Sequence, residues 1–272
     1  MLKKILKRIP GLRPLVLRLK SALAATDIRR GVLSFRNPID AHPIHYRFLP
    51  RICRQIIGNR RFLVCDIGAN QGVITERILK LSPHVQVLAF EPQRSCLDRL
   101  KQLEAKHPNM QLICSGIGSE EGSLTFYEQT NHGLSSFRKI NKSYSYGEKG
   151  AGGEKESYEA PIITLDDALK EVEYEHLLVK IDTQGYEKEV LVGAQQLLKE
   201  QKITAIILEL STCEKYEGQA TYLELLNRLE SFNFIPFDLE QGHREFPSEM
   251  LTEFDAAFVH KNFANKHLSL SV

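Results

Sequence analysis

The chain alternates short apolar runs with amphipathic stretches over most of its length. In 72–81, for example, Ile74, Ile78 and Leu81 share one face of a helix that follows the apolar run 61–68. The same order recurs along the chain, with strands predicted at 61–68, 85–92, 110–118, 176–187 and 203–211, and helices at 72–81, 93–107, 164–172, 189–201 and 221–231. Strands separated by single helices predict a parallel sheet of βαβ units.

Two departures from this rhythm are predicted. Residues 122–128 and 157–165 alternate apolar and polar positions as an antiparallel ribbon does, and they enclose a stretch rich in Gly, Ser and Lys, 131–156. A long segment of this kind is either a cover that closes over an active site or a surface loop, and both interpretations stay open. Residues 233–239 and 254–261 predict a terminal hairpin.

Composition fits one α/β domain with an extension. The chain has 272 residues, of which 42% are hydrophobic and 26% charged. We expect a basic, amphipathic helical extension at 1–50 and a catalytic domain at 51–272, with an inserted loop and hairpin at about 122–162.

Charge is distributed unevenly. Residues 1–30 carry nine Lys or Arg residues and one acidic residue, so their net charge is +8, which leaves −6 on the other 242 residues of a chain whose total is +2. A body of this charge predicts no nucleic-acid partner. The basic segment is either a peripheral contact with an anionic membrane surface or a docking helix with a solvated basic face.

The location expected from the sequence is cytoplasmic, with the inner membrane surface as an alternative. No run of 18 apolar residues is present, so no membrane-spanning helix is predicted. The five cysteines form no CxxC pair, and Cys65 and Cys114 lie in apolar runs, which is typical of reduced thiols.

An acid and two glycines follow the first predicted strand, in the sequence DIGANQG at 66–72. Neither a G-x-G-x-x-G nor a P-loop pattern is present, so a nucleoside ligand need not carry phosphates. Glycine lets a turn pass close beneath a ligand, and Asp66 offers a carboxylate to a cationic amine. Glu91 ends the second strand, where an acid can accept hydrogen bonds from two ribose hydroxyls. The pair predicts a ribose-containing ligand with an ammonium or sulfonium group.

Five blocks in this order resemble the FkbM-type family of S-adenosylmethionine-dependent methyltransferases. They are VCDIGANQG, LAFEP, IITLDDAL, LVKIDTQGYEKEVLVGAQQLL and IILELS, and they cover about residues 60–212. The resemblance implies a class I methyltransferase fold, Rossmann-like, with a seven-stranded, mostly parallel sheet whose last strand is antiparallel and with helices on both faces. It also implies O-methylation, often on a sugar, glycan or related small-molecule metabolite.

The resemblance further implies which residues hold S-adenosylmethionine. Asp66, Gly68, Asn70 and Gly72 would line its methionine part, and Glu91 would bind its ribose. Ser115 and Ile117 would lie near the adenine. Gln184 replaces a Glu that many members have, and it receives no role here.

Methyl transfer to an alcohol also requires a group that takes or stabilises the proton. Asp182 and Glu209 end neighbouring apolar strands at the edge where such sheets bind ligands. We expect Asp182 to orient the acceptor hydroxyl or accept its proton; the alternative is that it caps the helix that begins near Tyr186. Glu209 is either a substrate contact or a structural hydrogen-bonding group. His132 is a further candidate base in the inserted segment.

Three alternatives and one open question on metals remain. No HxxxH or HxE pattern marks a metal site, although Asp182 and Glu209 could hold Mg²⁺ through oxygen ligands. A nicotinamide oxidoreductase is disfavoured by the missing fingerprint. An N-methyltransferase is disfavoured because Asp182–Gly185 replaces the [ND]-P-P-[YFW] motif of that class. A non-catalytic regulatory module is disfavoured because it would not need Asp66, Glu91 and Asp182 together.

Overall fold

The computed structural model describes residues 46–144, 153–245 and 248–268, which belong to one compact unit, Ile44–Val272. The basic segment 1–30, with its expected membrane contact, lies outside the described residues, as do most of the 1–50 extension and part of the inserted segment.

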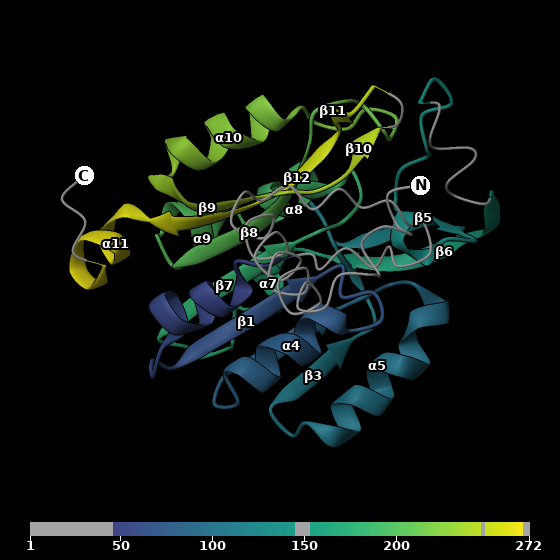
Figure 1. Ribbon diagram of the computed structural model, residues 1–272. Coiled ribbons are helices and arrows are strands. Elements are labelled where there is room, and N and C mark those ends of the chain that lie inside the picture. Colours follow the sequence, from purple (N-terminus) through teal and green to yellow (C-terminus); the bar gives the residue numbers. More distant parts are fainter. Residues whose placement is uncertain (1–45, 145–152, 246–247, 269–272) are drawn as a thin grey trace, which may run out of the picture. The chain divides into compact units, whose positions relative to one another are not determined.

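A seven-stranded sheet forms the centre, as predicted (Figure 1). Its order is β3-β2-β1-β7-β8-β12-β9, and β12 runs antiparallel to both of its neighbours while the β1, β2, β3, β7 and β8 pairings are parallel. The strands are β1 (Phe62–Ile67), β2 (Gln86–Phe90), β3 (Met110–Ile113), β7 (His176–Ile181), β8 (Ala205–Ser211), β9 (Phe234–Gln241) and β12 (Glu253–His260). The late strands β9 and β12 pair as the predicted hairpin.

Helices cover both faces of this sheet (Figure 1). Alternate residues of β1 belong to different cores: Val64 packs with one set of helices, and Leu63 with the other. The first set is α3 (Leu49–Ile52), the π-helical turn η1 (Cys53–Ile57), α4 (Val73–Leu81), α5 (Arg94–Lys106) and α11 (Lys261–His267). The second set is α7 (Leu165–Ala168), α8 (Glu187–Gly193), α9 (Gln195–Lys199) and α10 (Tyr222–Ser231).

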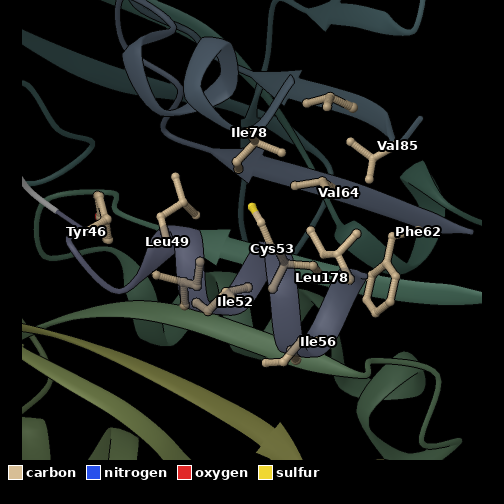
Figure 2. Close-up of a cluster of buried hydrophobic side chains, with 14 of the residues drawn as sticks. Tyr46, Leu49, Ile52, Cys53, Ile56, Phe62, Val64, Ile78, Val85 and Leu178 are labelled. Atoms are coloured by element: carbon tan, nitrogen blue, oxygen red, sulfur yellow. The ribbon is translucent and has the colours of Figure 1, made fainter. Parts of the chain in front are cut away.

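The first core extends further towards the N-terminus than the expected boundary at residue 51. Tyr46, Phe48 and Leu49 are each at most 3% exposed and pack with Ile78 and Leu178 in this cluster, as Figure 2 shows for four of them. Burial of large apolar side chains of this kind stabilises a fold by about 1.5–3 kcal/mol each. The residues just before α3 are therefore part of the folded body.

The inserted ribbon has its own small sheet, which Figure 1 shows beside the central one. The strand β6 (Glu154–Ile163) pairs antiparallel with β5 (Gly122–Gln129) and parallel with β4 (Gly116–Ile117). The prediction of one strand at 110–118 was wrong in this respect: the chain leaves the central sheet after Ile113 and β4 joins β6 instead. A further pair, β10 (Arg244–Glu245) and β11 (Met250–Leu251), lies near the C-terminus, and the predicted helix 189–201 is divided into α8 and α9.

Candidate functional site

The glycine turn between β1 and α4 owes both of its glycines to contacts within the protein. Gly68 has φ +73°, and an added Cβ would overlap the carbonyl oxygen of Asp182. Gly72 has φ +76°, and its Cβ would lie 2.8 Å from Leu103 and 2.9 Å from Leu100. The left-handed φ values and the close packing both exclude a side chain. The turn therefore lies directly against the backbone of Asp182, which follows β7.

Asp66 is directed into the core and is completely buried. Its Oδ1 lies 3.0 Å from the ammonium of Lys180 on β7, and its Oδ2 accepts a hydrogen bond of 2.5 Å from Thr75 on α4. The Lys180 ammonium also donates to the carbonyl of Gly68, at 2.7 Å. Asp66 thus supports the turn from within the protein, and its direct contact with a ligand stays a prediction.

Glu91 lies at the end of β2 and is only 4% exposed. Its Oε2 accepts a hydrogen bond of 2.6 Å from the backbone N–H of Asn70, and its Oε1 accepts one of 2.8 Å from Gln93. Asn70 itself has φ +51°, a conformation that Asn tolerates better than most residues. Burial raises the pKa of Glu91 to about 7, although both backbone donors oppose this rise. Glu91 therefore holds the glycine turn in place.

Ser115 and Ile117, expected near the adenine, are engaged in protein contacts. The hydroxyl of Ser115 is within 3.0 Å of the carbonyls of Gly116 and Pro161. Ile117 is 2% exposed and belongs to the core beneath α7 and α8. Cys114, which directly precedes them, is exposed after β3. Contact of Ser115 or Ile117 with a cofactor stays a prediction.

Asp182 and Glu209 are brought together by Gln184, to which the sequence assigned no role. The amide Nε2 of Gln184 donates to Asp182 Oδ1 and to Glu209 Oε2, at 2.9 Å each. Its Oε1 accepts a hydrogen bond of 2.9 Å from the hydroxyl of Tyr216. This amide orientation pairs every donor with an acceptor, whereas the flipped one would face two carboxylates with an oxygen. Gln184 has φ +55°, so its backbone is strained at this point.

Glu187 holds the turn before α8. Its Oε1 accepts hydrogen bonds from the backbone N–H groups of Thr183, at 3.0 Å, and Gly185, at 3.1 Å. Both donors precede the helix, and the role of Asp182 stays a prediction. Asp182 is 25% exposed in its side chain, with Oδ2 3.7 Å from the Lys180 ammonium and accepting a bond of 3.1 Å from the Tyr46 hydroxyl.

The surroundings of Glu209 favour its neutral form. Burial raises the pKa of this carboxyl well above its ordinary value, and the negative charges of Asp182, Asp255 and Glu187 raise it further, while Lys215 opposes them. Asp255 on β12 is the register partner of Glu209. A protonated carboxyl can donate a hydrogen bond, which an ionised one cannot.

His132 contacts the glycine turn. It lies in the short 3₁₀ helix η2 (His132–Leu134), is exposed, and has its Nε2 3.2 Å from Nε2 of Gln71. The same segment reaches the β7–α8 turn, because the Ser136 hydroxyl donates to the carbonyl of Gln184 at 2.7 Å and the Tyr216 hydroxyl contacts the carbonyl of Leu134 at 3.1 Å. Residues 132–136 are therefore anchored to both turns.

Sequence reasoning missed several residues of this site. Lys180 could have been found, since a lysine inside the apolar run HLLVKI requires a buried partner. Tyr46 and Tyr216 gave no local signal, because only the fold brings them to Asp182 and Gln184. In the part of the chain that the structure describes, no group of three or more His, Cys, Asp or Glu residues is arranged to hold a metal ion. Metal independence stays a prediction.

A cavity of about 860 Å³ lies at the opposite, amino end of the strands. Phe62, Leu63 and Gln86 line it together with residues of α7 and α9. None of the predicted site residues reaches it. Among the described residues, no helix is long and apolar enough to cross a membrane.

Comparison with known proteins identifies a family for most of this chain. Residues 66–236 match the family described as "Methyltransferase FkbM domain". The 2-O-methyltransferase NoeI of Sinorhizobium fredii is 27% identical over 179 residues, which are 64% of this chain and 73% of that protein.

Two solved structures have TM-scores below 0.5. A precorrin-6y C5,15-methyltransferase from Geobacter metallireducens has a TM-score of 0.43 and 10% identity over 78% of this chain and 87% of that one. A 1,6-didemethyltoxoflavin-N1-methyltransferase from Burkholderia thailandensis has 0.44 and 12%, over 93% and 90%. At these scores we infer nothing from the two proteins, and the fold assignment rests on the strand order itself. The match over residues 66–236 spans more than half of the chain, which therefore belongs to the FkbM-domain family of methyltransferases.

Proposed function

We propose that this methyltransferase transfers the methyl group of S-adenosylmethionine to a hydroxyl of a sugar, glycan or related metabolite, with Asp182 accepting the hydroxyl proton. The observation that supports this most is the pairing of Asp182 with Glu209 through Gln184, immediately beside the glycine turn. The name of the S. fredii relative, a 2-O-methyltransferase, also favours an oxygen acceptor.

Glu91, at the end of β2, has hydrogen-bonding capacity that suits the ribose of S-adenosylmethionine. The two oxygens of Glu91 offer about four lone pairs, and the backbone donors Asn70 and Gln93 occupy one on each oxygen. The other lone pairs are free of these two bonds and suit two ribose hydroxyls. When bound, S-adenosylmethionine supplies a methyl group on a positively charged sulfur, which is open to attack by an oxygen nucleophile. Glu91, Gly68, Asn70 and Gly72 would hold it.

Asp182 and Glu209 have different roles at the acceptor: one accepts a proton and the other donates a hydrogen bond. Asp182 is partly exposed and beside the buried Lys180 ammonium, which favours its ionised form and thus its capacity to receive a proton. Glu209, with its raised pKa, donates a hydrogen bond to a neighbouring oxygen of the acceptor. Two carboxyl groups in different protonation states suit a molecule with adjacent hydroxyls, and fixed positions for both could supply about 7–11 kcal/mol of rate acceleration through orientation.

His132 is assigned to the cofactor side. Its ring contacts Gln71 of the glycine turn. An alanine at His132 is therefore expected to weaken cofactor affinity more than it lowers the maximal rate. The opposite result would make His132 a base candidate again.

The test uses purified full-length protein with S-adenosylmethionine and a panel of acceptors: monosaccharides, oligosaccharides and amines. We expect methyl transfer to a sugar oxygen, located by NMR of the product. Asp182→Asn should lower kcat about 100-fold and leave the affinity for S-adenosylhomocysteine unchanged, while Glu91→Ala should weaken that affinity. Transfer to an amine nitrogen alone, or full activity of Asp182→Asn, would refute the proposal. Absence of S-adenosylmethionine binding would favour the alternative of a non-catalytic regulatory module.

A further inference from the structure

Tyr46 contributes to the site from outside the family domain. It lies three residues before the start of α3 and twenty residues before the range 66–236 that matches the family. The residue is 3% exposed, and its hydroxyl donates to Asp182 Oδ2 over 3.1 Å. Figure 2 shows Tyr46 at one end of the first hydrophobic core, with Phe62 and Val85 towards the other end. Its ring is thus packed in the core while its hydroxyl reaches the carboxyl ends of the strands.

The backbone of Tyr46 is held in an unfavourable conformation. Its φ of +60° lies in the left-handed region, which bulky residues rarely adopt. The carbonyl of Tyr46 accepts hydrogen bonds from Leu49 N–H at 3.0 Å and from Arg77 Nη2 at 3.3 Å. Left-handed residues of this kind persist only where the surrounding structure fixes them, and they cluster at functional sites.

The hydroxyl of Tyr46 and the amide of Gln184 bind opposite oxygens of the same carboxylate. Gln184 donates to Asp182 Oδ1 and Tyr46 donates to Oδ2, beside which the Lys180 ammonium lies at 3.7 Å. Donors on both oxygens fix the rotation of the carboxylate as well as its position. Charged groups near Tyr46 and Asp182 include the acidic residues Glu187, Glu209 and Asp255, and Arg77 contacts the Tyr46 carbonyl.

We propose that Tyr46 is a positioning residue, which orients the Asp182 carboxylate for the acceptor hydroxyl and stabilises its ionised form. The catalytic part of this inference rests on the proposed function, in which Asp182 accepts the proton. The contact itself does not, and it can be tested without an acceptor.

The first experiment follows the Asp182 carboxyl carbon by NMR in protein labelled with ¹³C at aspartate carboxyls and saturated with S-adenosylhomocysteine. Asp182→Asn identifies the resonance. Removal of a donor to the ionised form raises a carboxyl pKa, so Tyr46→Phe should move the titration midpoint of Asp182 up by about 1 unit. Tyr174→Phe, a change at a half-buried tyrosine of the opposite core, should leave it unchanged. An unchanged midpoint in Tyr46→Phe, or equal shifts in both variants, would overturn the inference.

The second experiment uses the best acceptor from the panel. Tyr46→Phe should lower kcat about tenfold, shift the acid limb of the pH–rate profile up by the same amount as the NMR midpoint, and keep the affinity for S-adenosylhomocysteine. Tyr46→Met, which lacks the hydroxyl and keeps apolar bulk, should behave in the same way if Tyr46→Phe does not fold. A normal kcat and an unshifted profile would overturn the positioning role. Failure of the wild type to methylate any hydroxyl would instead count against the proposed function, and the NMR result would stand separately.

Discussion

The ammonium of Lys180 lies 3.0 Å from the carboxylate of Asp66, and the two side chains are 2% and 0% exposed. They are register partners on the adjacent parallel strands β7 and β1. Because the same ammonium donates to the carbonyl of Gly68, the ion pair joins the glycine turn to the strand that ends in Asp182. The geometry of the cofactor turn and of the acceptor carboxylate therefore depends on one buried pair of charges.

Asp66→Asn should be strongly destabilising, because it leaves the Lys180 ammonium buried without its anion. Loss of one partner of such a pair costs about 3–5 kcal/mol of the free energy of unfolding. Urea denaturation measures this change. Glu76→Gln is the matched control, since it removes the acid of two solvent-accessible pairs, with Lys80 (66% exposed) and Arg99 (42% exposed); it should cost less than about 1 kcal/mol. Similar losses of unfolding free energy in both variants would show that the buried Asp66–Lys180 pair contributes no more to stability than an exposed pair.

Gln184→Glu should destabilise the fold in a pH-dependent way. It places a third carboxyl between Asp182 and Glu209, so the pKa of the new group is raised in the folded state. Below the pKa that this group has in the unfolded chain, the substitution leaves the free energy of unfolding unchanged. As the pH rises, the free energy of unfolding falls, by about 2 kcal/mol at pH 8. Urea denaturation at pH 5 and pH 8 should show the loss mainly at pH 8. Gln196→Glu is the control, because its partner Glu200 is on an exposed helix surface; its effect should stay within about 0.5 kcal/mol.

Two glycine substitutions separate backbone strain from packing. Gly72→Ala meets both a left-handed φ and contacts below 3.0 Å with Leu100 and Leu103, so it should cost about 3 kcal/mol. Gly153 has φ +89° with nothing within 4 Å of an added Cβ, so Gly153→Ala should cost about 1 kcal/mol. Thermal unfolding of the two variants compares them directly. Equal costs would mean that α5 moves away from the turn without penalty.

Cofactor affinity should rise with pH through the titration of Glu91. The pKa of this carboxyl is raised by burial to about 7 from an ordinary value of 4.5, so the folded protein without cofactor binds a proton that the unfolded chain has lost. Its contribution to stability is thus present below pH 4.5 and is lost as the pH rises through 7. Ribose hydroxyls favour the ionised form, so affinity for S-adenosylhomocysteine should increase about tenfold from pH 6 to pH 8.

Isothermal calorimetry in buffers of different ionisation enthalpy should detect the release of a proton on binding. Glu91→Gln should bind more weakly and without this pH dependence. A wild-type affinity that is constant between pH 6 and pH 8 would contradict the ribose role of Glu91.

The sequence by itself determined the sheet, the family and the candidate acids. The alternation of apolar runs with amphipathic helices specifies βαβ units, and parallel strands bring their carboxyl ends to one edge. The acids near the carboxyl ends of β1, β2, β7 and β8 were therefore predictable as a group.

Only the tertiary structure decided what each acid contacts. A side chain at a strand end can face a ligand or the core, and the choice depends on partners far away in the chain: Asp66 turns to Lys180, and Asp182 is held between Tyr46 and Gln184. These contacts join residues separated by 114 positions for the ion pair and 136 for the tyrosine, so no local pattern records them. Desolvation also arises only from packing, because burial is what raises the pKa of Glu91 and Glu209.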